Sequence, residues 1–256
     1  MSSMSRGITA EDIWYSYSGK IRALRGAFLS ANPGEICVLL GANGSGKSTL
    51  LYIIAGLLKP EKGYVLYDGK DISLLGSRYR MKVGMLFQNP DDQIFNISVR
   101  EELAYGLRQL GYKGDRLEEK ILDTARRFRI CDLLDRSPYE LSFGEKKIVM
   151  LAAVTIHDPE IVILDEPFAN LGANYRKKIM DYIDNAKEKN KIIIIATHDP
   201  FIALRLADRV TIIRDGKTIF SGSKKEFATR KLFREADLED PCTLLSYIWD
   251  PCKLDY

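Results

Sequence analysis

Three continuous apolar runs stand out in the pattern of hydrophobic and polar positions: residues 36–40, 161–164 and 192–196. Each run has the length of a strand and no polar alternation, which is typical of strands buried on both faces of a parallel sheet. A fourth short apolar run, residues 83–87, leads into the polar segment 88–93. The pattern therefore predicts an α/β fold built on buried strands.

Paired strand signals predict three hairpins. Residues 8–17 alternate and end at Ser18-Gly19, and residues 21–30 are their expected partner. Asp68-Gly69 and Asp215-Gly216 lie between apolar segments on either side (64–67 with 70–72, and 209–214 with 217–221). Asp-Gly is favoured in tight hairpin turns because both residues accept positive φ angles.

The segment 90–157 has a different character, with helical periodicity and no strand signal. Apolar residues recur in helical spacing across 98–110, and we expect Ser98 and Glu101 to form a capping box at its start. Residues 115–129 and 144–157 are further expected helices, which makes the block a helical insertion between strands of the core. Residues 175–189 form another expected amphipathic helix.

Length and composition are consistent with one large domain. The chain has 256 residues, of which 46% are hydrophobic. We assign residues 1–235 to this domain, with the helical part at about 90–157, and 236–256 to a C-terminal tail. Pro241 and Pro251 interrupt the tail, whose apolar face is a candidate dimer contact formed by Leu244, Leu245, Ile248 and Trp249.

Several functional classes receive no support. No apolar stretch approaches the roughly 20 residues of a membrane span, and the first ten residues lack the apolar segment of a signal peptide. A net charge of +3, mixed along the chain, gives no case for nucleic acid as a partner. The four cysteines are far apart, so we expect a reducing compartment and no disulfide framework.

A glycine-rich loop follows the run 36–40. Gly41, Gly46, Lys47 and Ser48 fit the phosphate-binding pattern G-x-x-x-x-G-K-[ST]. Glycines, including Gly44, allow the backbone N–H groups to approach a phosphate at the start of a helix. Lys47 adds a full positive charge, and the Ser48 hydroxyl is suited to Mg²⁺. A Gly-Ser loop without a ligand is the alternative, but the flanking strand and helix signals argue for a nucleotide site.

An acidic pair, Asp165-Glu166, follows the run 161–164. In a parallel sheet this places both carboxylates at the edge where the glycine-rich loop opens. Asp165 is then expected to face Mg²⁺ at Ser48, and Glu166 to polarise an attacking water as general base. Two solvated acids at a strand end are the alternative interpretation.

Two further residues end strands at the same edge. His198 follows the run 192–196 and could contact a γ-phosphate and the attacking water, although a strand-end histidine alone is more often structural. Gln88 closes the run 83–87 and could contact Mg²⁺ or water. The segment Leu141-Ser142-Phe143-Gly144-Glu145 precedes an expected helix, where it could bind an anion or serve as a plain N-cap.

The chain resembles the ATP-binding-cassette (ABC) ATPases in the order of five features. These are the glycine-rich loop, Gln88, Leu-Ser-Phe-Gly, residues 161–166 and His198. The resemblance covers about residues 8–227. It implies a P-loop NTPase core with an antiparallel β subdomain and an inserted α-helical subdomain. It also implies an ATPase that uses ATP and Mg²⁺, in which two nucleotides are sandwiched by a head-to-tail dimer.

The resemblance assigns roles residue by residue. Ser142 and Gly144 belong to a signature motif that binds the γ-phosphate of ATP held by the other subunit. Tyr17 matches the adenine-stacking aromatic residue, with Tyr15 as the alternative; a strand aromatic in the core would also explain Tyr17. The implied catalytic residues are Glu166, His198 and Gln88, and the implied metal ligands are Ser48, Gln88 and Asp165. The implied ATP-binding residues are Tyr17, Gly41, Asn43, Gly44, Gly46, Lys47, Ser48, Thr49, Ser142 and Gly144.

The stretch from Phe87 to Phe95, Phe-Gln-Asn-Pro-Asp-Asp-Gln-Ile-Phe, is similar to the ATPases of energy-coupling-factor and cobalt-type importers. That branch implies a second ABC ATPase, identical or different, together with integral membrane coupling and substrate-binding subunits. The chain would then lie at the cytoplasmic face of the membrane, as a peripheral subunit of an importer of a vitamin or metal ion. A groove beside Gln88, formed in part by residues 98–110, would receive a helix of the membrane subunit.

Two positions depart from the family. Glu145 stands where Gln is usual, and Gly172 replaces an acid that helps to couple the two sites of the dimer. We therefore expect slow but real hydrolysis. A soluble ABC ATPase, for example in iron–sulfur cluster assembly, remains an alternative because Leu-Ser-x-Gly-Glu also resembles such proteins. A nucleotide-binding switch without turnover is a third interpretation, against which the set Asp165, Glu166 and His198 argues.

Overall fold

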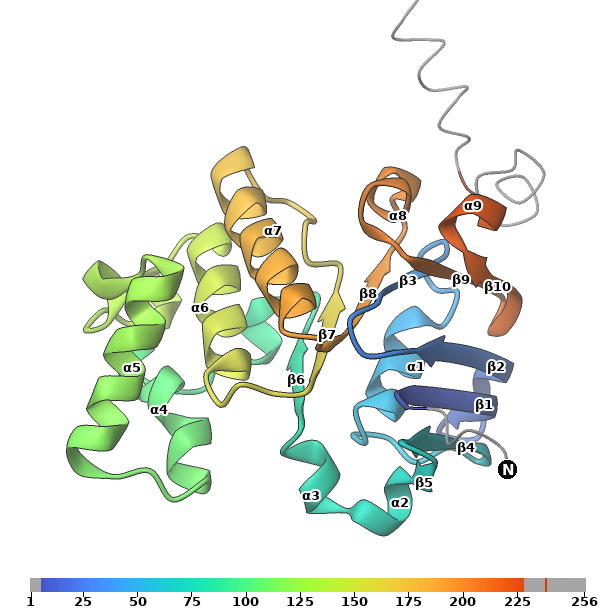
Figure 1. The fold of residues 1–256 in the computed structure, drawn as a ribbon, viewed down its shortest axis with the longest axis horizontal. Coiled ribbons are helices and arrows are strands. Elements are labelled where there is room, and N and C mark those ends of the chain that lie inside the picture. Colours follow the sequence, from blue (N-terminus) through green and yellow to red (C-terminus); the bar gives the residue numbers. More distant parts are fainter. Residues whose placement is uncertain (1–5, 228–237, 239–256) are drawn as a thin grey trace, which may run out of the picture.

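The computed structural model describes residues 6–227 and Leu238. In this region two β-sheets lie against each other, and helix α1 (Lys47–Ile54) packs against strands of both (Figure 1). The mixed α/β architecture confirms the predicted fold class.

The larger sheet of the described region has the strand order β10-β9-β3-β8-β7-β6. Its strands are β3 (Ile36–Leu40), β6 (Val83–Leu86), β7 (Ile161–Asp165), β8 (Ile192–Thr197), β9 (Arg209–Arg214) and β10 (Lys217–Ser223). All neighbours are parallel except β9 and β10. Every residue of β3, β7 and β8 is buried, since Val38 and Leu40 face one core and Cys37 and Leu39 face the other. The three apolar runs are therefore buried parallel strands, as predicted.

The smaller sheet is antiparallel, with the order β2-β1-β4-β5. Its strands are β1 (Ile8–Tyr17), β2 (Ile21–Ala31), β4 (Lys62–Tyr67) and β5 (Lys70–Asp71). The predicted Asp-Gly turns are present, with φ of 48° and 76° at Asp68-Gly69 and 49° and 75° at Asp215-Gly216. Thr218 joins the two sheets, because its hydroxyl accepts from Phe28 N at 2.9 Å and donates to Phe28 O at 2.7 Å.

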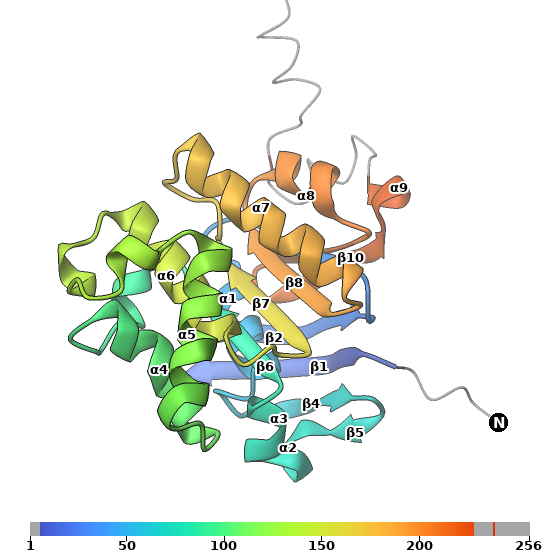
Figure 2. The same cartoon turned by 60° about the vertical axis from the view of Figure 1, so that its left-hand side comes forward.

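Helices α4 (Val99–Gln109), α5 (Gly114–Phe128) and α6 (Phe143–Thr155) lie together at one end of the molecule (Figure 1). Residues 90–157, all of which the structure describes, contain no strand, as expected for an inserted helical subdomain. Helices α7 (Ala173–Glu188) and α8 (Pro200–Leu206) cover the face of the larger sheet opposite to α1 (Figure 2).

The capping box predicted for Ser98 and Glu101 is only half formed. Ser98 Oγ accepts from Glu101 N at 3.3 Å, but the Glu101 carboxylate accepts from Arg108 Nη2 at 3.0 Å. A charged donor is a stronger partner than a backbone N–H, and Arg108 lies on the same side of α4. A complete capping box occurs instead at Ser142 and Glu145, at the start of α6.

Among the α-helices of the described residues, four short ones have no counterpart among the predicted elements: α2 (Ile72–Leu75), α3 (Ser77–Arg80), α8 and α9 (Lys224–Phe227). Asp71 Oδ1 accepts from Ser73 N at 2.8 Å and caps α2, so β5 ends at Asp71 and not at the predicted Ile72. Asp199 caps α8 in the same way, through Phe201 N. For α2 and α8, the available signal was an aspartate directly before an apolar residue or a proline.

The predicted apolar face of the tail lies outside the described residues. Within the described region, none of the helices combines the length and the apolar character that crossing a bilayer requires.

Candidate functional site

The glycine-rich loop connects β3 to α1 and is held between both sheets. Gly46, the N-cap of α1, has a φ of 105°, and a Cβ there would lie 2.7 Å from Ala23 O of β2. A Cβ at Gly41 would lie 2.4 Å from Ile213 O of β9. Glycine is therefore required at both positions, at 41 by close packing and at 46 by packing and backbone conformation together.

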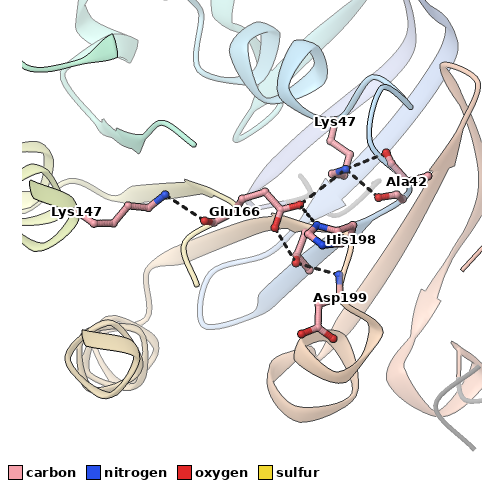
Figure 3. A network of polar contacts seen from close by, with 8 residues as sticks. Ala42, Lys47, Lys147, Glu166, His198 and Asp199 are labelled. Atoms are coloured by element: carbon pink, nitrogen blue, oxygen red, sulfur yellow. Dashed lines mark hydrogen bonds and ion pairs between the residues drawn. The ribbon is translucent and has the colours of Figure 1, made fainter. Parts of the chain in front are cut away.

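Lys47 lies in the first turn of α1 and folds back over the loop. Its Nζ donates to Gly41 O at 2.8 Å and to Ala42 O at 3.0 Å, and it lies 4.0 Å from Glu166 Oε1 (Figure 3). Burial lowers the pKa of the Lys47 ammonium, while the carboxylates of Glu166 and Asp165 oppose that shift. The site thus holds a positive charge whose partners are loop carbonyls and nearby acids.

A cavity of about 460 Å³ opens over the loop. Among the residues that line it are the predicted site residues Tyr17, Asn43, Gly44, Gly46, Lys47, Ser48, Thr49, Gln88, Asp165 and Glu166. Tyr17 Oη lies 3.2 Å from Thr49 Oγ1, whereas Tyr15 packs against the core and does not line the cavity. The structure therefore brings together most of the predicted residues, from separate segments of the chain.

Asp165 ends β7 and is buried, with only 1% of its surface exposed. Neither of its carboxylate oxygens has a hydrogen-bond partner among the described residues. Burial raises the pKa of this carboxyl, and the nearby Ser48 hydroxyl opposes the shift. Hard cations such as Mg²⁺ prefer oxygen ligands, and here two carboxylate oxygens without a hydrogen-bond partner in the described part of the chain lie beside a hydroxyl. The residues present therefore fit a Mg²⁺ site formed by Asp165 and Ser48, with Gln88 at the same cavity.

Glu166 follows β7 in a left-handed backbone conformation, with a φ of 43°. Its N–H donates to Ala196 O of β8 at 2.9 Å. One carboxylate oxygen accepts from Thr197 Oγ1 at 3.1 Å, and the other lies 2.7 Å from His198 Nδ1 (Figure 3). The Glu166 side chain is almost fully buried, while half of the His198 side chain is exposed. The carboxylate is therefore held in one orientation by the end of the neighbouring strand.

Sequence reasoning missed Thr197. Its hydroxyl donates to Glu166 and accepts from Asp199 N at 3.1 Å, so it links the acid to the start of α8 (Figure 3). The only available signal was a polar residue at the end of an apolar strand, next to the predicted His198.

The segment after Gln88 is shaped by Gln93. Gln93 Oε1 accepts from Phe87 N at 3.2 Å, and its Nε2 donates to Met85 O at 2.8 Å, which closes the loop back onto β6. A 3₁₀ helix, Pro90–Asp92, lies within the predicted polar loop and is capped by Asn89. The loop thus has a defined shape that presents the Gln88 side chain to the cavity.

Lys147 is a second buried lysine of the site that sequence reasoning missed. It lies in α6, is fully buried, and its Nζ donates to Gln88 O and Glu166 O. Burial lowers the pKa of this ammonium to about 8, although Asp165 and Glu166 stabilise the charged form. Lys146 and Lys147 are adjacent in an expected helix, and nothing in the sequence indicated that one of them would be buried.

Ser142 and Gly144 lie apart from this cavity and do not line it. Ser142 is exposed at the start of α6, and Glu145 accepts from Ser142 N at 2.8 Å and from Ser142 Oγ at 2.7 Å. These hydrogen bonds lower the pKa of the Glu145 carboxyl. Gly144 packs against Tyr175 of α7, because a Cβ there would lie 2.5 Å from its ring. One chain therefore contains two separate parts of the predicted site.

Comparison with known proteins gives a consistent result. Residues 24–169 match the sequence profile of the family described as ABC transporter. A Methanothermobacter marburgensis protein named as an ABC transporter ATP-binding protein is 40% identical over 238 residues, covering 91% of this chain and 86% of its own length. The energy-coupling factor transporter ATP-binding protein EcfA of Methanothermobacter thermautotrophicus is 36% identical over 240 residues, covering 92% and 77%.

Solved structures agree with the sequence relatives. CbiO1 of Clostridium perfringens, part of the ABC transporter complex CbiONQ, superposes with a TM-score of 0.76. It is 34% identical to this chain, and the match covers 93% of this chain and 97% of CbiO1. The resemblance inferred from the sequence motifs is confirmed: the chain belongs to the ABC transporter family and is one of its ATP-binding proteins.

Proposed function

We propose that this chain is the ATPase subunit of an energy-coupling-factor type importer of a vitamin or metal ion. The observation that carries the proposal is the cavity that Lys47, Ser48, Asp165 and Glu166 line together. His198 lies within hydrogen-bond distance of Glu166. The similarity to EcfA and CbiO1 supports the choice of branch.

In the proposed mechanism the phosphates of ATP lie over the glycine-rich loop, at the N-terminus of α1. Phosphate oxygens replace Gly41 O and Ala42 O as partners of Lys47, whose charge is already in place. Asp165, Ser48 and Gln88 would hold Mg²⁺, which supplies charge neutralisation on the phosphates when bound. Tyr17, which also lines the cavity, is the proposed stacking partner of the adenine.

Glu166 acts as the general base that accepts a proton from the attacking water. Thr197 and His198 fix its carboxylate, and the Lys47 ammonium lies 4.0 Å from one of its oxygens. His198 is the exposed member of this pair, and its proposed role is to contact the γ-phosphate and the water. The proposed chemistry therefore uses one acid that is already oriented before substrate arrives.

A second ABC ATPase, identical or different, is the proposed dimer partner. Ser142 and Gly144 do not line the cavity of their own chain, which supports a head-to-tail arrangement in which each chain completes the site of the other. Each closed dimer would hold two ATP molecules.

Gly172 offers a test of coupling across that dimer. It is the N-cap of α7 with no side-chain cap, its φ of −70° suits any residue, and a Cβ added there would meet no atom of the described residues within 4 Å. Gly172→Asp is expected to stabilise the fold by a few tenths of a kcal/mol, since aspartate caps helices slightly better than glycine. Turnover of the dimer is expected to rise as well, because an acid is restored between the two sites.

The matched control is Gly172→Ala, which adds a Cβ but neither a cap nor a charge. Steady-state ATPase assays and thermal melts of both variants separate the effects. An alanine variant that gains as much turnover as the aspartate variant would contradict a role for the acid.

Integral membrane coupling and substrate-binding subunits are the proposed further partners, at the cytoplasmic face of the membrane. Next to the Gln88 loop, Phe95 and Tyr105 pack edge to face with ring centroids 4.6 Å apart, yet 57% and 47% of their surfaces are exposed. The buried Glu102 accepts from Phe95 N at 3.3 Å and from Asn96 N at 3.0 Å, which anchors the backbone below these rings. An exposed apolar pair on an anchored backbone favours docking of a helix from another subunit.

Purification of the tagged chain from native membranes in mild detergent tests this assignment. Wild-type protein is expected to carry integral membrane proteins and a second ABC ATPase in stoichiometric amounts. Phe95→Glu is expected to reduce recovery of the membrane proteins by roughly 30-fold, the effect of losing a central interface residue. Leu74→Glu is the control, because Leu74 is 84% exposed on α2, outside the helical block 90–157 to which Phe95 and Tyr105 belong.

Recovery of the wild-type chain with cytosolic proteins alone would overturn the transport proposal and favour a soluble ABC ATPase. Equal recovery of membrane proteins with Phe95→Glu and with Leu74→Glu would instead contradict docking at the Phe95–Tyr105 pair.

A further inference from the structure

Lys147 connects three segments that the proposed mechanism uses separately. It belongs to α6, the helix that begins at Ser142, and its Nζ donates to Gln88 O at 2.6 Å and to Glu166 O at 3.1 Å. Gln88 follows β6 and Glu166 follows β7, and these strands are neighbours in the larger sheet. The ammonium therefore holds the backbones of two residues whose side chains line the same cavity.

Burial makes this contact different from a surface lysine contact. Lys147 has no exposed surface, and the ring centroid of Phe143 lies 5.7 Å from its Nζ. A lysine is rarely fully buried unless its charge has partners, and here the hydrogen bonds go to two carbonyls on separate segments. The neighbouring Lys146 differs, because its Nζ pairs with the half-exposed carboxylate of Asp91 at 2.7 Å.

Glu166 is the residue that most needs such support. Its left-handed backbone, with a φ of 43°, is unfavourable for a residue other than glycine and persists only when its surroundings hold it. Ala196 O accepts from the N–H of Glu166, and Lys147 donates to its C=O. Both peptide groups that flank the Glu166 side chain are therefore fixed, one from β8 and one from α6.

We propose that Lys147 is a positioning residue of the hydrolytic site. From helix α6 it holds the backbones of Glu166 and the Gln88 loop in fixed positions relative to each other. This inference rests on the proposed role of Glu166 as general base. Because Ser142 caps the same helix, a shift of α6 on contact with a second chain moves Lys147 and, through it, the backbone of Glu166. The start of α6 and the hydrolytic acid are thus mechanically linked within one chain.

Lys147→Met and Lys147→Gln form the test, since the two side chains are similar in size and differ in hydrogen-bond donors. For the full chain in its complex, kcat, KM for MgATP and the Kd of a fluorescent ATP analogue are measured. Lys147→Met is expected to lower kcat by about 10- to 100-fold, the range that a small misplacement of a reacting group produces. The Kd of the analogue is expected to be unchanged, because the hydrogen bonds of Lys147 go to Gln88 and Glu166 and not to the glycine-rich loop.

Lys147→Gln retains donors and is expected to recover part of the lost kcat. Lys146→Met is the matched control on the same helix, expected to leave kcat close to that of the wild type because it breaks only a partly exposed ion pair. Unchanged kcat in Lys147→Met, or a loss of ATP binding as large as the loss of kcat, would overturn the proposal. Should Lys147→Met fail to fold, Lys147→Leu replaces it as the variant without a hydrogen-bond donor, and an unchanged kcat in that variant would overturn the proposal equally.

Glu166→Gln is assayed alongside. If that variant hydrolyses ATP at the wild-type rate, the proposed function of Glu166 fails, whatever Lys147 does. If it is inactive while Lys147→Met is fully active, only the inference about Lys147 fails.

Discussion

Glu166→Gln is expected to reduce ATP hydrolysis by about 10²- to 10⁴-fold, the usual contribution of a general base. An amide keeps the shape of the side chain and can still accept from Thr197, but it cannot take a proton from water. ATP binding is expected to survive, so the variant accumulates as an ATP-bound dimer. Phosphate release assays measure the first effect, and size-exclusion chromatography with light scattering measures the second.

Glu160→Gln is the control for this variant. Glu160 directly precedes β7, at the opposite end of the strand from Glu166, and its carboxylate interacts with Tyr67 and Lys82. The same chemical change at that end of the strand is expected to leave turnover close to the wild-type value. If Glu166→Gln hydrolysed ATP at the wild-type rate, the general base would have to be another group.

Lys47→Met is expected to weaken ATP binding by about 10²- to 10³-fold, corresponding to about 3–4 kcal/mol for the loss of charge-assisted hydrogen bonds to phosphate. The folded state without nucleotide is expected to tolerate the change. Burial lowers the pKa of Lys47, which means that the fold disfavours its charged form, and methionine removes that penalty. The nucleotide-dependent rise in melting temperature is therefore expected to disappear while the melting temperature without nucleotide changes little.

Lys59→Met provides the comparison, because Lys59 is exposed just beyond α1 and does not line the nucleotide cavity. Its nucleotide-dependent shift is expected to equal that of the wild type. A Lys47→Met protein that retained the full shift would contradict the proposed phosphate contact.

The features that could be predicted from the sequence are those encoded by local patterns. Residues such as Val38 and Leu39 are recognisable as buried strand because a parallel strand covered on both faces contains no polar alternation. Gly41, Gly46 and Lys47 could be placed because the loop needs glycine at fixed positions for close packing. Asp165 and Glu166 could be placed because strand ends of a parallel sheet share one edge.

The features that could not be predicted depend on contacts between distant segments. Thr197 and Lys147 act on Glu166 from 31 and 19 residues away, and neither has a local signature. The predicted cap at Ser98 is present, but the capping box is not completed because Arg108, two turns later, binds Glu101 more strongly than the backbone does. The four-residue helices α2 and α3 are too short for a hydrophobic period to show.

The capping box at the start of α6 has a thermodynamic consequence for assembly. The Glu145 carboxylate already accepts from Ser142 N and Ser142 Oγ, and its tether of three residues keeps its effective concentration in the millimolar range or above. If a phosphate held by a second chain reaches Ser142, it must exchange with this carboxylate. The phosphate then gains these hydrogen bonds only at the expense of the ones that Glu145 already makes. Closure must therefore draw its free energy from the greater charge of the phosphate and from surfaces buried elsewhere between the chains.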